Sequence, residues 1–268
     1  MHFLFFVVFI MLVTFIFVVY MIWRCVLLVN KTYEYPTCYG IMITGKDETR
    51  LKYAQISTLN FFDQDYKGKK QLIIINHSEE RVNIPSMYEH LVIQIQVDKA
   101  THSLGAMRNV ALDLVPNDAL WTSWDDDDYR SKWYLSTLYN FMKSEKVSAV
   151  TFTDRYEYNI SNGMVWRFRM ESGFGYACML CKKKKGFKYH DVDTFEDRDL
   201  KKFYASSIYV YENVDKVMYI RLVHANNTSM FVHRTNSYLD LNETNGEYLV
   251  SDKEKELVKN IMVAFEKS

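Results

Sequence analysis

The segment ALWTSWDDDDYR, residues 119–130, decides the fold that we predict for this chain. An apolar and aromatic run ends there at four consecutive carboxylates, Asp125 to Asp128. Side chains alternate between the two faces of a strand, so a strand that continued would place Asp125 and Asp127 on one face. Asp126 and Asp128 would then lie on the other face. Adjacent carboxylates repel one another, so the cluster requires a cation or strong hydrogen-bond donors nearby.

Two interpretations of the acidic run are open from the residues alone. A solvated acidic turn is the ordinary explanation of such a run. However, these acids follow a hydrophobic strand, which is where an open α/β sheet binds its ligand. A segment with helical periodicity follows over residues 131–145, with Leu135, Leu138 and Met142 on one stripe. Oxygen ligands suit Mg²⁺ and Mn²⁺, so the sequence favours a ligand site with a divalent cation as candidate.

On both sides of this segment, strands and helices are predicted to alternate. The first half of the chain gives predicted strands over residues 39–44, 71–76, 91–97, 120–124 and 148–153, and predicted helices over 47–62, 103–114 and 131–145. The second half gives predicted strands over 165–170, 176–181 and 219–223, and predicted helices over 196–205 and 253–265. Strands separated by helices indicate an α/β fold with a mostly parallel sheet covered on both faces.

Composition limits the class of protein. Lys plus Arg and Asp plus Glu each number 33, so the net charge is zero and nothing indicates a nucleic-acid surface. The chain has 20 Tyr and 17 Phe but only 9 Gly and 3 Pro. This balance predicts a well-filled core with few flexible linkers and argues against disorder.

Residues 3–23 contain no charged side chain. A helix of that length spans about 30 Å, the thickness of a bilayer core. The basic segment and small-residue cleavage site of a signal peptide are both missing. We therefore predict a single transmembrane anchor over residues 1–24, a short linker over 25–37 and one domain over 38–268.

The orientation of this anchor rests on few charges. Arg24 and Lys31 follow it, which favours a cytosolic domain by the positive-inside rule. The arrangement with the domain on the lumenal side stays open. Asn76 belongs to a glycosylation sequon but ends a very apolar predicted strand, where a glycan would be hard to accommodate. This sequon therefore favours either a cytosolic domain or a sequon that is not used.

Four polar motifs recur at the ends of the predicted strands and helices. Thr44 and Asn76 end the first two strands, and LGAMRNVA over residues 104–111 opens the helix before the acids. The acidic run itself is the third motif. The fourth is the pair Glu196–Asp197, which we expect in the first turn of the helix over 196–205. Acids are common in a first helical turn, so this pair alone would carry little weight.

In this order the motifs resemble those of glycosyltransferase family 2, whose enzymes have the GT-A fold. The resemblance covers most of residues 38–230. It implies that Thr44 and Asn76 lie against the nucleotide base and ribose of a donor. The family commonly has an Asp where this chain has Asn76, which leaves the identity of the base open. Arg108 and Asn109 would face the donor, although a surface helix charge explains Arg108 equally well.

The resemblance also assigns the acids. Asp125 and Asp127 match the D-x-D motif that binds metal and ribose, and Asp126 would contribute to donor binding. Asp197 matches the usual catalytic base, with Glu196 beside it. His224 lies where many GT-A enzymes have a late histidine that helps to hold the metal, although a lone histidine is more often structural.

The resemblance implies a metal-dependent, inverting glycosyltransferase of the hexosyl or related type. A cation, Mn²⁺ or Mg²⁺, would stabilise the charge that develops on the leaving phosphate of a nucleoside-diphosphate sugar. Asp197 would take the proton of the acceptor hydroxyl. We expect a UDP-sugar first among the donors, and a carbohydrate, lipid-linked or protein acceptor.

Two alternatives remain at this stage. A nucleotidyltransferase on a related sheet would favour a glycine-rich, basic loop after the first strand, whereas TGKDETR, residues 44–50, has one glycine. A membrane-tethered, catalytically inactive binding protein is the other alternative. Asn76 speaks mildly for it, and the intact acids Asp125, Asp127 and Asp197 speak against it.

Overall fold

We describe a computed structural model of the chain. It describes residues 14, 16–21, 35–45, 47–98, 100, 102–175, 178–194, 196–213, 216–224, 246–248 and 250–267. The chain divides into two compact units, Met1–Tyr35 and Pro36–Ser268. In the first unit, Thr14 and residues 16–21 are helical, and the remainder of the predicted anchor lies outside the described residues. Within the described part of the chain, no helix is long and apolar enough to span a bilayer.

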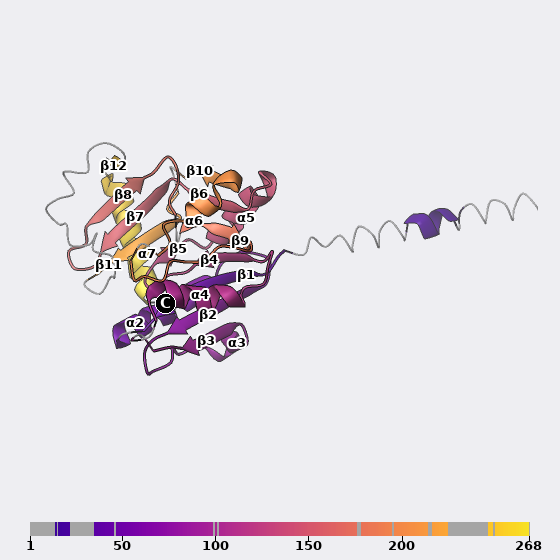
Figure 1. The fold of residues 1–268 in the computed structure, drawn as a ribbon. Helices are drawn as coiled ribbons and strands as arrows, with labels where there is room; N and C mark the ends of the chain where they lie inside the picture. Colours follow the sequence, from indigo (N-terminus) through magenta and orange to yellow (C-terminus); the bar gives the residue numbers. More distant parts are fainter. Residues whose placement is uncertain are drawn as a thin grey trace, which may run out of the picture. The chain divides into compact units, whose positions relative to one another are not determined.

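The second unit is built on a seven-stranded sheet with the strand order β10-β6-β9-β4-β1-β2-β3 (Figure 1). Its strands are β1 (Cys38–Thr44), β2 (Lys70–Asn76), β3 (Val92–Gln96), β4 (Leu120–Ser123), β6 (Ala149–Phe152), β9 (Leu180–Lys182) and β10 (Ile208–Tyr211). Five of these strands were predicted with bounds that differ by a few residues. The predicted strand over residues 176–181 overlaps β9 only in part, and residues 176–177 lie outside the described residues.

The direction of the strands confirms the prediction of a mostly parallel sheet. β1 pairs in parallel with β2 and β4, β2 pairs in parallel with β3, and β10 pairs in parallel with β6. β9 is the exception, because it runs antiparallel to both of its neighbours, β4 and β6. The carboxyl ends of β1, β2 and β4 therefore lie at one edge of the sheet, which is the edge that carries Thr44, Asn76 and the four acids.

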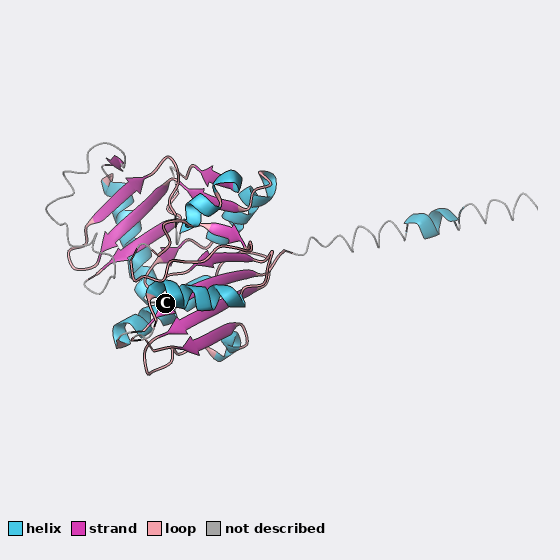
Figure 2. Cartoon of the chain, viewed as in Figure 1, coloured by secondary structure: helices cyan, strands magenta, loops and turns pink. Residues whose placement is uncertain are grey.

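Helices pack on both faces of this sheet (Figure 2). On one face, α2 (Glu48–Phe62) and α5 (Tyr134–Ser144) contribute Phe61 and Leu138 to a core that includes Met42 of β1. On the other face, α4 (Leu104–Leu114) contributes Met107 to a core that includes Ile41 of β1. Neighbouring residues of β1 thus enter opposite cores, as the alternation of a buried strand requires.

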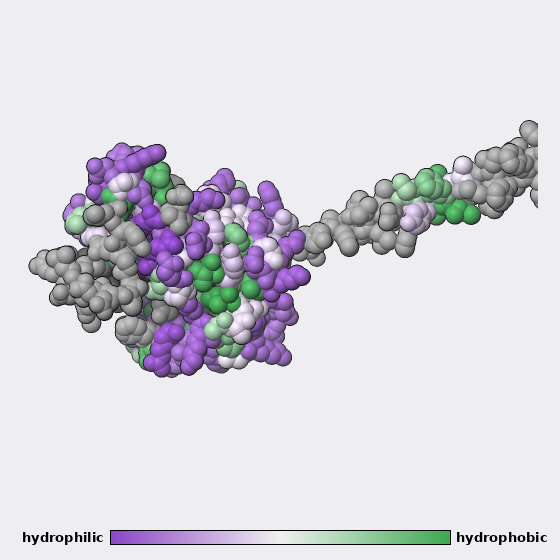
Figure 3. Space-filling model, turned by 90° about the horizontal axis from the view of Figure 1, so that it is seen from above, coloured by the Kyte–Doolittle hydropathy of each residue, from purple (hydrophilic) through white to green (hydrophobic). Residues whose placement is uncertain are grey.

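A second sheet, which the sequence analysis did not foresee, has the strand order β12-β8-β7-β11-β5. Its strands are β5 (Tyr129–Arg130), β7 (Asp154–Asn159), β8 (Val165–Arg169), β11 (Tyr219–Val223) and β12 (Gly246–Tyr248). The closing helix α7 (Asp252–Lys267) covers it, and Val258 and Met262 pack there with Ile220 and Leu222 of β11. The surface around these three cores is mostly hydrophilic in the view of Figure 3.

One predicted helix is wrong in its bounds. Residues 196–199 form turns, and the helix α6 covers only Leu200–Phe203, before a 3₁₀ turn over Ala205–Ser207. The carbonyl of Glu196 accepts a hydrogen bond from the amide of His190 at 3.0 Å. The segment is therefore held by the loop before it rather than by a helical turn. The remaining helix, α3 (Ser86–Glu89), is short and exposed.

Candidate functional site

The four acids lie in the connection between the two sheets. β4 ends at Ser123, the backbone turns at Asp126 and Asp127, and β5 begins at Tyr129. The strand does not continue through the acids, so the alternation expected for Asp125 to Asp128 does not apply. Trp124 donates its amide to the carbonyl of Ile41 at 2.8 Å, which fixes the start of the turn against β1.

Asp126 is completely buried beneath the end of β1. The hydroxyl of Thr44 donates to its Oδ2 at 2.7 Å, and Nη2 of Arg50 lies 2.5 Å from its Oδ1. Burial raises the pKa of Asp126 well above its ordinary value, although Arg50 acts in the opposite direction. Thr44 and Asp126, both predicted to lie near a donor, are thus direct partners.

Asp127 shares Arg50 with Asp126. Nη1 of Arg50 donates to Oδ2 of Asp127, and the same oxygen lies 3.0 Å from Nε2 of His224. Burial would raise the pKa of Asp127, but the attraction of Arg50 and the hydrogen bond with His224 outweigh it and lower the pKa to about 2. His224 stacks on the ring of Tyr53 with 5.5 Å between centroids. The predicted pair Asp127 and His224 is therefore in direct contact.

Asp128 points toward the second sheet. The hydroxyl of Tyr219 donates to its Oδ2, and the amide of Leu222 donates to its Oδ1 at 3.2 Å. Burial and the neighbouring acids Asp127 and Asp125 raise the pKa of Asp128 to about 7. This carboxyl group joins the acidic turn to β11.

Arg108 links the acidic turn to the Glu196–Asp197 segment. It is buried, so the alternative of a surface helix charge is wrong. Its Nη1 donates to the hydroxyl of Ser123 at 3.0 Å, and its Nη2 lies 3.5 Å from Oδ1 of Asp125. Its Nε lies 3.0 Å from Oε1 of Glu196, an ion pair in which the N–H is not aimed at the oxygen. The two acidic motifs, 70 residues apart in sequence, thus meet at one guanidinium.

Asp197 is a buried carboxyl group beside this ion pair. Burial and the negative charge of Glu196 raise its pKa to about 7, against the smaller opposing effect of Arg108. A carboxylate with a pKa near neutrality is suited to accept a proton at physiological pH.

Gly105 explains how this segment is held in place. A methyl group at its Cα would lie 1.6 Å from the carbonyl oxygen of His190 and 3.1 Å from Cβ of Glu196. The amide of Gly105 also donates to the carbonyl of Val192 at 3.0 Å. Only glycine allows α4 to approach the loop this closely, so the G-x-x-R-N motif positions the Glu196–Asp197 segment.

Two residues that were predicted to contact the sugar donor, Asn76 and Asn109, form hydrogen bonds with the backbone instead. Oδ1 of Asn76 accepts the amide of Ser78 at 2.8 Å, and its Nδ2 donates to the carbonyl of Glu80 at 2.7 Å. Asn109 bonds both the amide and the carbonyl of Tyr189, at 2.8 and 3.0 Å. Contact of either side chain with a donor stays a prediction.

The predicted metal ligands do not fit a divalent cation as they are arranged. Among the described residues, no three His, Cys, Asp or Glu side chains come together as a metal site. Asp127 and His224 are adjacent, but the guanidinium of Arg50 lies against the carboxylates of Asp126 and Asp127. Asp125, whose side chain is 33% exposed, pairs with Arg108 instead.

Arg50 is the site residue that the sequence analysis missed. It lies in the first turn of α2, whose N-terminus is capped by the side chain of Asp47 at 2.9 Å from the amide of Arg50. The signal was present, because four adjacent carboxylates require strong donors and TGKDETR follows the strand that ends beside them. Its single arginine was not connected to the acids.

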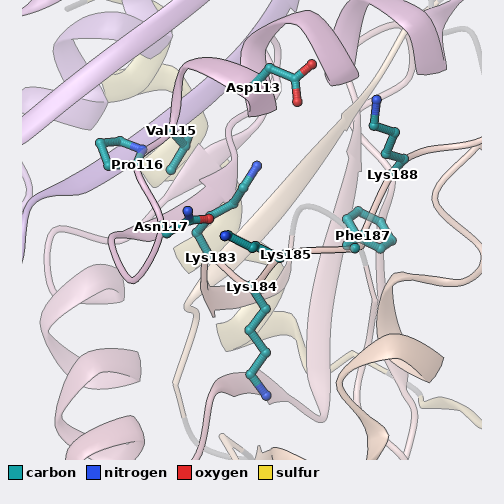
Figure 4. A pocket seen from close by; sticks show the side chains of 10 residues that line it. Asp113, Val115, Pro116, Asn117, Lys183, Lys184, Lys185, Phe187 and Lys188 are labelled. Atoms are coloured by element: carbon teal, nitrogen blue, oxygen red, sulfur yellow. The ribbon is translucent and has the colours of Figure 1, made fainter.

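A basic hollow lies beside the start of β4, whereas the acids follow the end of that strand. Figure 4 shows the side chains that line it. The hollow lies beside the start of β4 and the end of β9, between Val115 and Asn117 on one side and Phe187 on the other. Lys183 and Lys188 are among the side chains that line it, and Lys183 donates to the carbonyl of Leu112 at 2.7 Å. None of the predicted site residues lines this hollow.

These features define a mixed α/β fold of the GT-A-like class, with a seven-stranded central sheet and polar residues at its carboxyl edge. No protein-family model matches the chain, and no curated protein matches it in sequence.

Solved structures of TarS from S. aureus are similar to this chain. The complex of TarS 1-349 with UDP has a TM-score of 0.55 and 16% identity, over 70% of this chain and 60% of that chain. The complex with UDP-GlcNAc has a TM-score of 0.53 and 14% identity, over 72% and 60%. A longer TarS structure has a TM-score of 0.53 and 16% identity, over 70% and 37%. The match thus spans less than two thirds of TarS, and at these identities it shows the fold alone.

Proposed function

We propose that the unit Pro36–Ser268 is a glycosyltransferase that takes its sugar from a nucleoside-diphosphate sugar, with a UDP-sugar as the first candidate. One observation carries the proposal: Arg108 contacts both Asp125 and Glu196, so that two acidic motifs form one site at the carboxyl edge of the sheet. Ligands of open α/β sheets bind at this edge. The similar TarS structures hold UDP and UDP-GlcNAc, which supports a donor of this class.

The proposed reaction is a single displacement that inverts the anomeric carbon. The acceptor oxygen forms a bond to that carbon while the bond to the phosphate oxygen breaks, and the bonding electrons leave with the nucleoside diphosphate. Asp197 accepts the proton of the acceptor hydroxyl. Arg108 supplies positive charge near the leaving phosphate.

The sequence predicts a metal ion, whereas the structure places Arg50 against the carboxylates of Asp126 and Asp127. Mn²⁺ or Mg²⁺ held by Asp125, Asp127 and His224 would stabilise the leaving group as a Lewis acid. The comparison of Mn²⁺ with EDTA in the nucleotide-binding test decides between the two. We also propose that residues 3–23 tether the enzyme to a membrane, with the domain on the cytosolic side and the lumenal side as the alternative. The acceptor would be a carbohydrate, a lipid-linked molecule or a protein.

Nucleotide binding is the first test. The full chain in detergent is heated with UDP, GDP, CDP or ADP, each with Mn²⁺ and with EDTA. Ligand at 100 times its Kd adds about 2.7 kcal/mol to the free energy of unfolding, which raises Tm by roughly 5–10 °C for a chain of this size. We expect UDP to give this shift, and Asp63→Asn, an exposed acid at the far end of α2, to leave it unchanged. No shift with any nucleotide would refute the proposal.

Turnover is the second test, measured as UDP release from UDP-GlcNAc with a panel of sugar acceptors. We expect Asp197→Asn to lower the rate by about 10²–10⁴-fold and to leave UDP affinity unchanged. Because the base acts in its ionised form and has a pKa of about 7, the wild-type rate should rise with pH up to about 7 and then level off. Asp199→Asn, two residues away and about half exposed, is the matched control.

A nucleotide-binding protein without transferase activity is the second candidate. The occupation of Asp126 and Asp127 by Arg50 favours it, because these carboxylates are then less able to hold a metal. UDP binding without sugar release from any donor would support this candidate over the enzyme.

A further inference from the structure

Arg50 is placed as a bridge between two adjacent carboxylates. Its Nη2 lies 2.5 Å from Oδ1 of Asp126, and its Nη1 donates to Oδ2 of Asp127. The arginine side chain is 15% exposed, while those of Asp126 and Asp127 are 0% and 8% exposed. The guanidinium thus covers the two acids and keeps a limited exposure of its own.

The chemistry of a guanidinium allows more than these two contacts. It carries five N–H donors and a permanent positive charge, and its planar fork matches phosphate as well as carboxylate. The contact of Nη1 with Asp127 is a hydrogen bond, whereas the contact of Nη2 with Oδ1 of Asp126 is an ion pair in which the N–H is not aimed at the oxygen. The guanidinium therefore carries more N–H donors than its hydrogen bond to Asp127 uses.

A purely structural role for Arg50 explains this arrangement less well, because its two partners have other contacts. Asp126 already accepts a hydrogen bond from Thr44, and Asp127 lies against His224. Arg50 and Arg108 both contact the acidic turn, Arg108 through Asp125. The two guanidiniums thus lie at the carboxyl edge of the sheet, where open α/β sheets bind their ligands.

We propose that Arg50 is the cation of the donor site. Its guanidinium, held by Asp126 and Asp127, binds the diphosphate in the place that a divalent cation would take, so donor binding and sugar transfer do not require a metal ion. This inference rests on the proposed function of the site. In the transfer step the electrons of the broken sugar–phosphate bond move to a phosphate oxygen, which Arg50 neutralises, and the acceptor proton goes to Asp197.

The deciding measurement is the affinity of the full chain for UDP by calorimetry, in EDTA and in Mn²⁺. We expect binding in EDTA, with Kd changing less than about threefold when Mn²⁺ is added. UDP binding that requires Mn²⁺ would overturn the inference and leave the proposed function intact. Absence of UDP binding in both conditions would overturn the proposed function together with this inference.

Variants of Arg50 test the contact itself. Arg50→Met removes all donors and should weaken UDP binding in EDTA by about 10–100-fold, the effect of losing charged hydrogen bonds. Arg50→Lys keeps the charge but not the fork and should lose less. Because Arg50→Met leaves two buried acids without this partner, the double variant Arg50→Met/Asp127→Asn provides a version with less uncompensated charge. It should show the same weak binding, whereas wild-type affinity in the double variant would refute the proposal.

Asp127→Asn separates the two kinds of site. In a metal site this change removes a ligand and abolishes metal-dependent UDP binding. If Arg50 is the cation, Asp126 still holds the guanidinium, and UDP affinity in EDTA should fall by less than about tenfold. Loss of all binding in Asp127→Asn, with the fold intact by circular dichroism, would contradict the proposal.

Discussion

Among the buried clusters of carboxylates and arginines in the described part of the chain, two differ clearly in place and in partners. The site cluster joins Asp126 and Asp127 to Arg50 in a turn at the carboxyl edge of the central sheet. The second cluster joins Asp154 to Arg167 and Arg169 within the second sheet. Both acids at the centre, Asp126 and Asp154, are fully buried.

The second cluster has the contacts of a structural support. Arg167 donates from Nε to Oδ1 of Asp154 at 2.9 Å, and Arg169 donates from Nη1 to Oδ2 at 3.2 Å. Asp154 and Arg169 are direct partners in the ladder between β7 and β8. Arg167 also reaches Glu254 of α7 at 3.1 Å, so the cluster ties the helix to the sheet.

The comparison teaches that an acid–arginine pair does not by itself mark a functional site. The Asp154 cluster connects regular elements that pack on one another, whereas the Arg50 cluster lies where parallel strands end, which is the edge at which open α/β sheets bind ligands. Position in the fold, rather than residue type, separates the two.

Removal of Asp154 should give the largest loss of stability and is the most direct test of the difference between the two clusters. Asp154→Ala leaves two largely buried guanidiniums with fewer partners and should lower the free energy of unfolding by about 3–5 kcal/mol. Urea denaturation measures this loss, and UDP affinity of the folded fraction should not change. Glu171→Ala, which removes an exposed partner of Arg169, is the control and should have little effect. A loss of UDP affinity without a loss of stability would contradict a structural role for Asp154.

The pH dependence of stability should report on Asp128, which belongs to the same acidic turn as Asp126 and Asp127. The pKa of Asp128 is raised to about 7, so the folded state holds a proton between about pH 4 and 7 that the unfolded state has released. The free energy of unfolding therefore falls as pH rises through this window. Asp128→Asn removes this titration, and relative to wild type the variant should gain on the order of 2 kcal/mol between pH 5 and pH 8.

Urea denaturation at several pH values checks this prediction. Asp118→Asn, an exposed acid in the turn before β4, should follow the wild-type profile. Parallel profiles for wild type and Asp128→Asn would show that the carboxyl group of Asp128 ionises normally in the folded state.

The smallest effect is expected at Thr44. Thr44→Val removes the hydroxyl that donates to buried Asp126 and should cost about 1–2 kcal/mol of stability, as expected when a buried acceptor loses its donor. Thr58→Val is the matched control, because the hydroxyl of Thr58 is also buried but only donates to the helix carbonyl of Ala54. Equal losses in the two variants would show that Asp126 does not depend on Thr44.

The central sheet could be predicted because its strands carry their signal locally. Residues 71–76, QLIIIN, form a continuous apolar run, which is typical of a strand buried on both faces. β7, with the sequence DRYEYN, mixes charged and aromatic residues and gives no such signal. Asp154 is paired by Arg167 and Arg169 of β8. Glu157 is paired by Arg155 of β7 and Arg221 of β11. The local pattern does not reveal these partners. Two strands of the second sheet, β8 and β11, were predicted over residues 165–170 and 219–223. Its other strands, and the pairing of all five into a separate sheet, were not.

Within the site, the sequence indicated several of the residues that come together but not which of them form pairs. Arg108, Asp125 and Glu196 were all selected, and they do meet. The helix expected from Glu196 was wrong, because the tertiary contact with Arg108 outweighs the weak helical preference of an acidic first turn. Arg50 was missed because its partners lie 76 and 77 residues further along the chain.

The reversed strand β9 has a consequence for the order in which the protein assembles. Cys181 of β9 pairs with Trp121 of β4 on one side and with Ala149 of β6 on the other. Until the ribosome has made residues 180–182, the parallel half of the sheet ends in an unpaired edge at β4, and β6 has no route to it. Unpaired strand edges are sites of aggregation during synthesis. The chain is thus exposed to misassembly until three residues late in the sequence join both halves of the sheet.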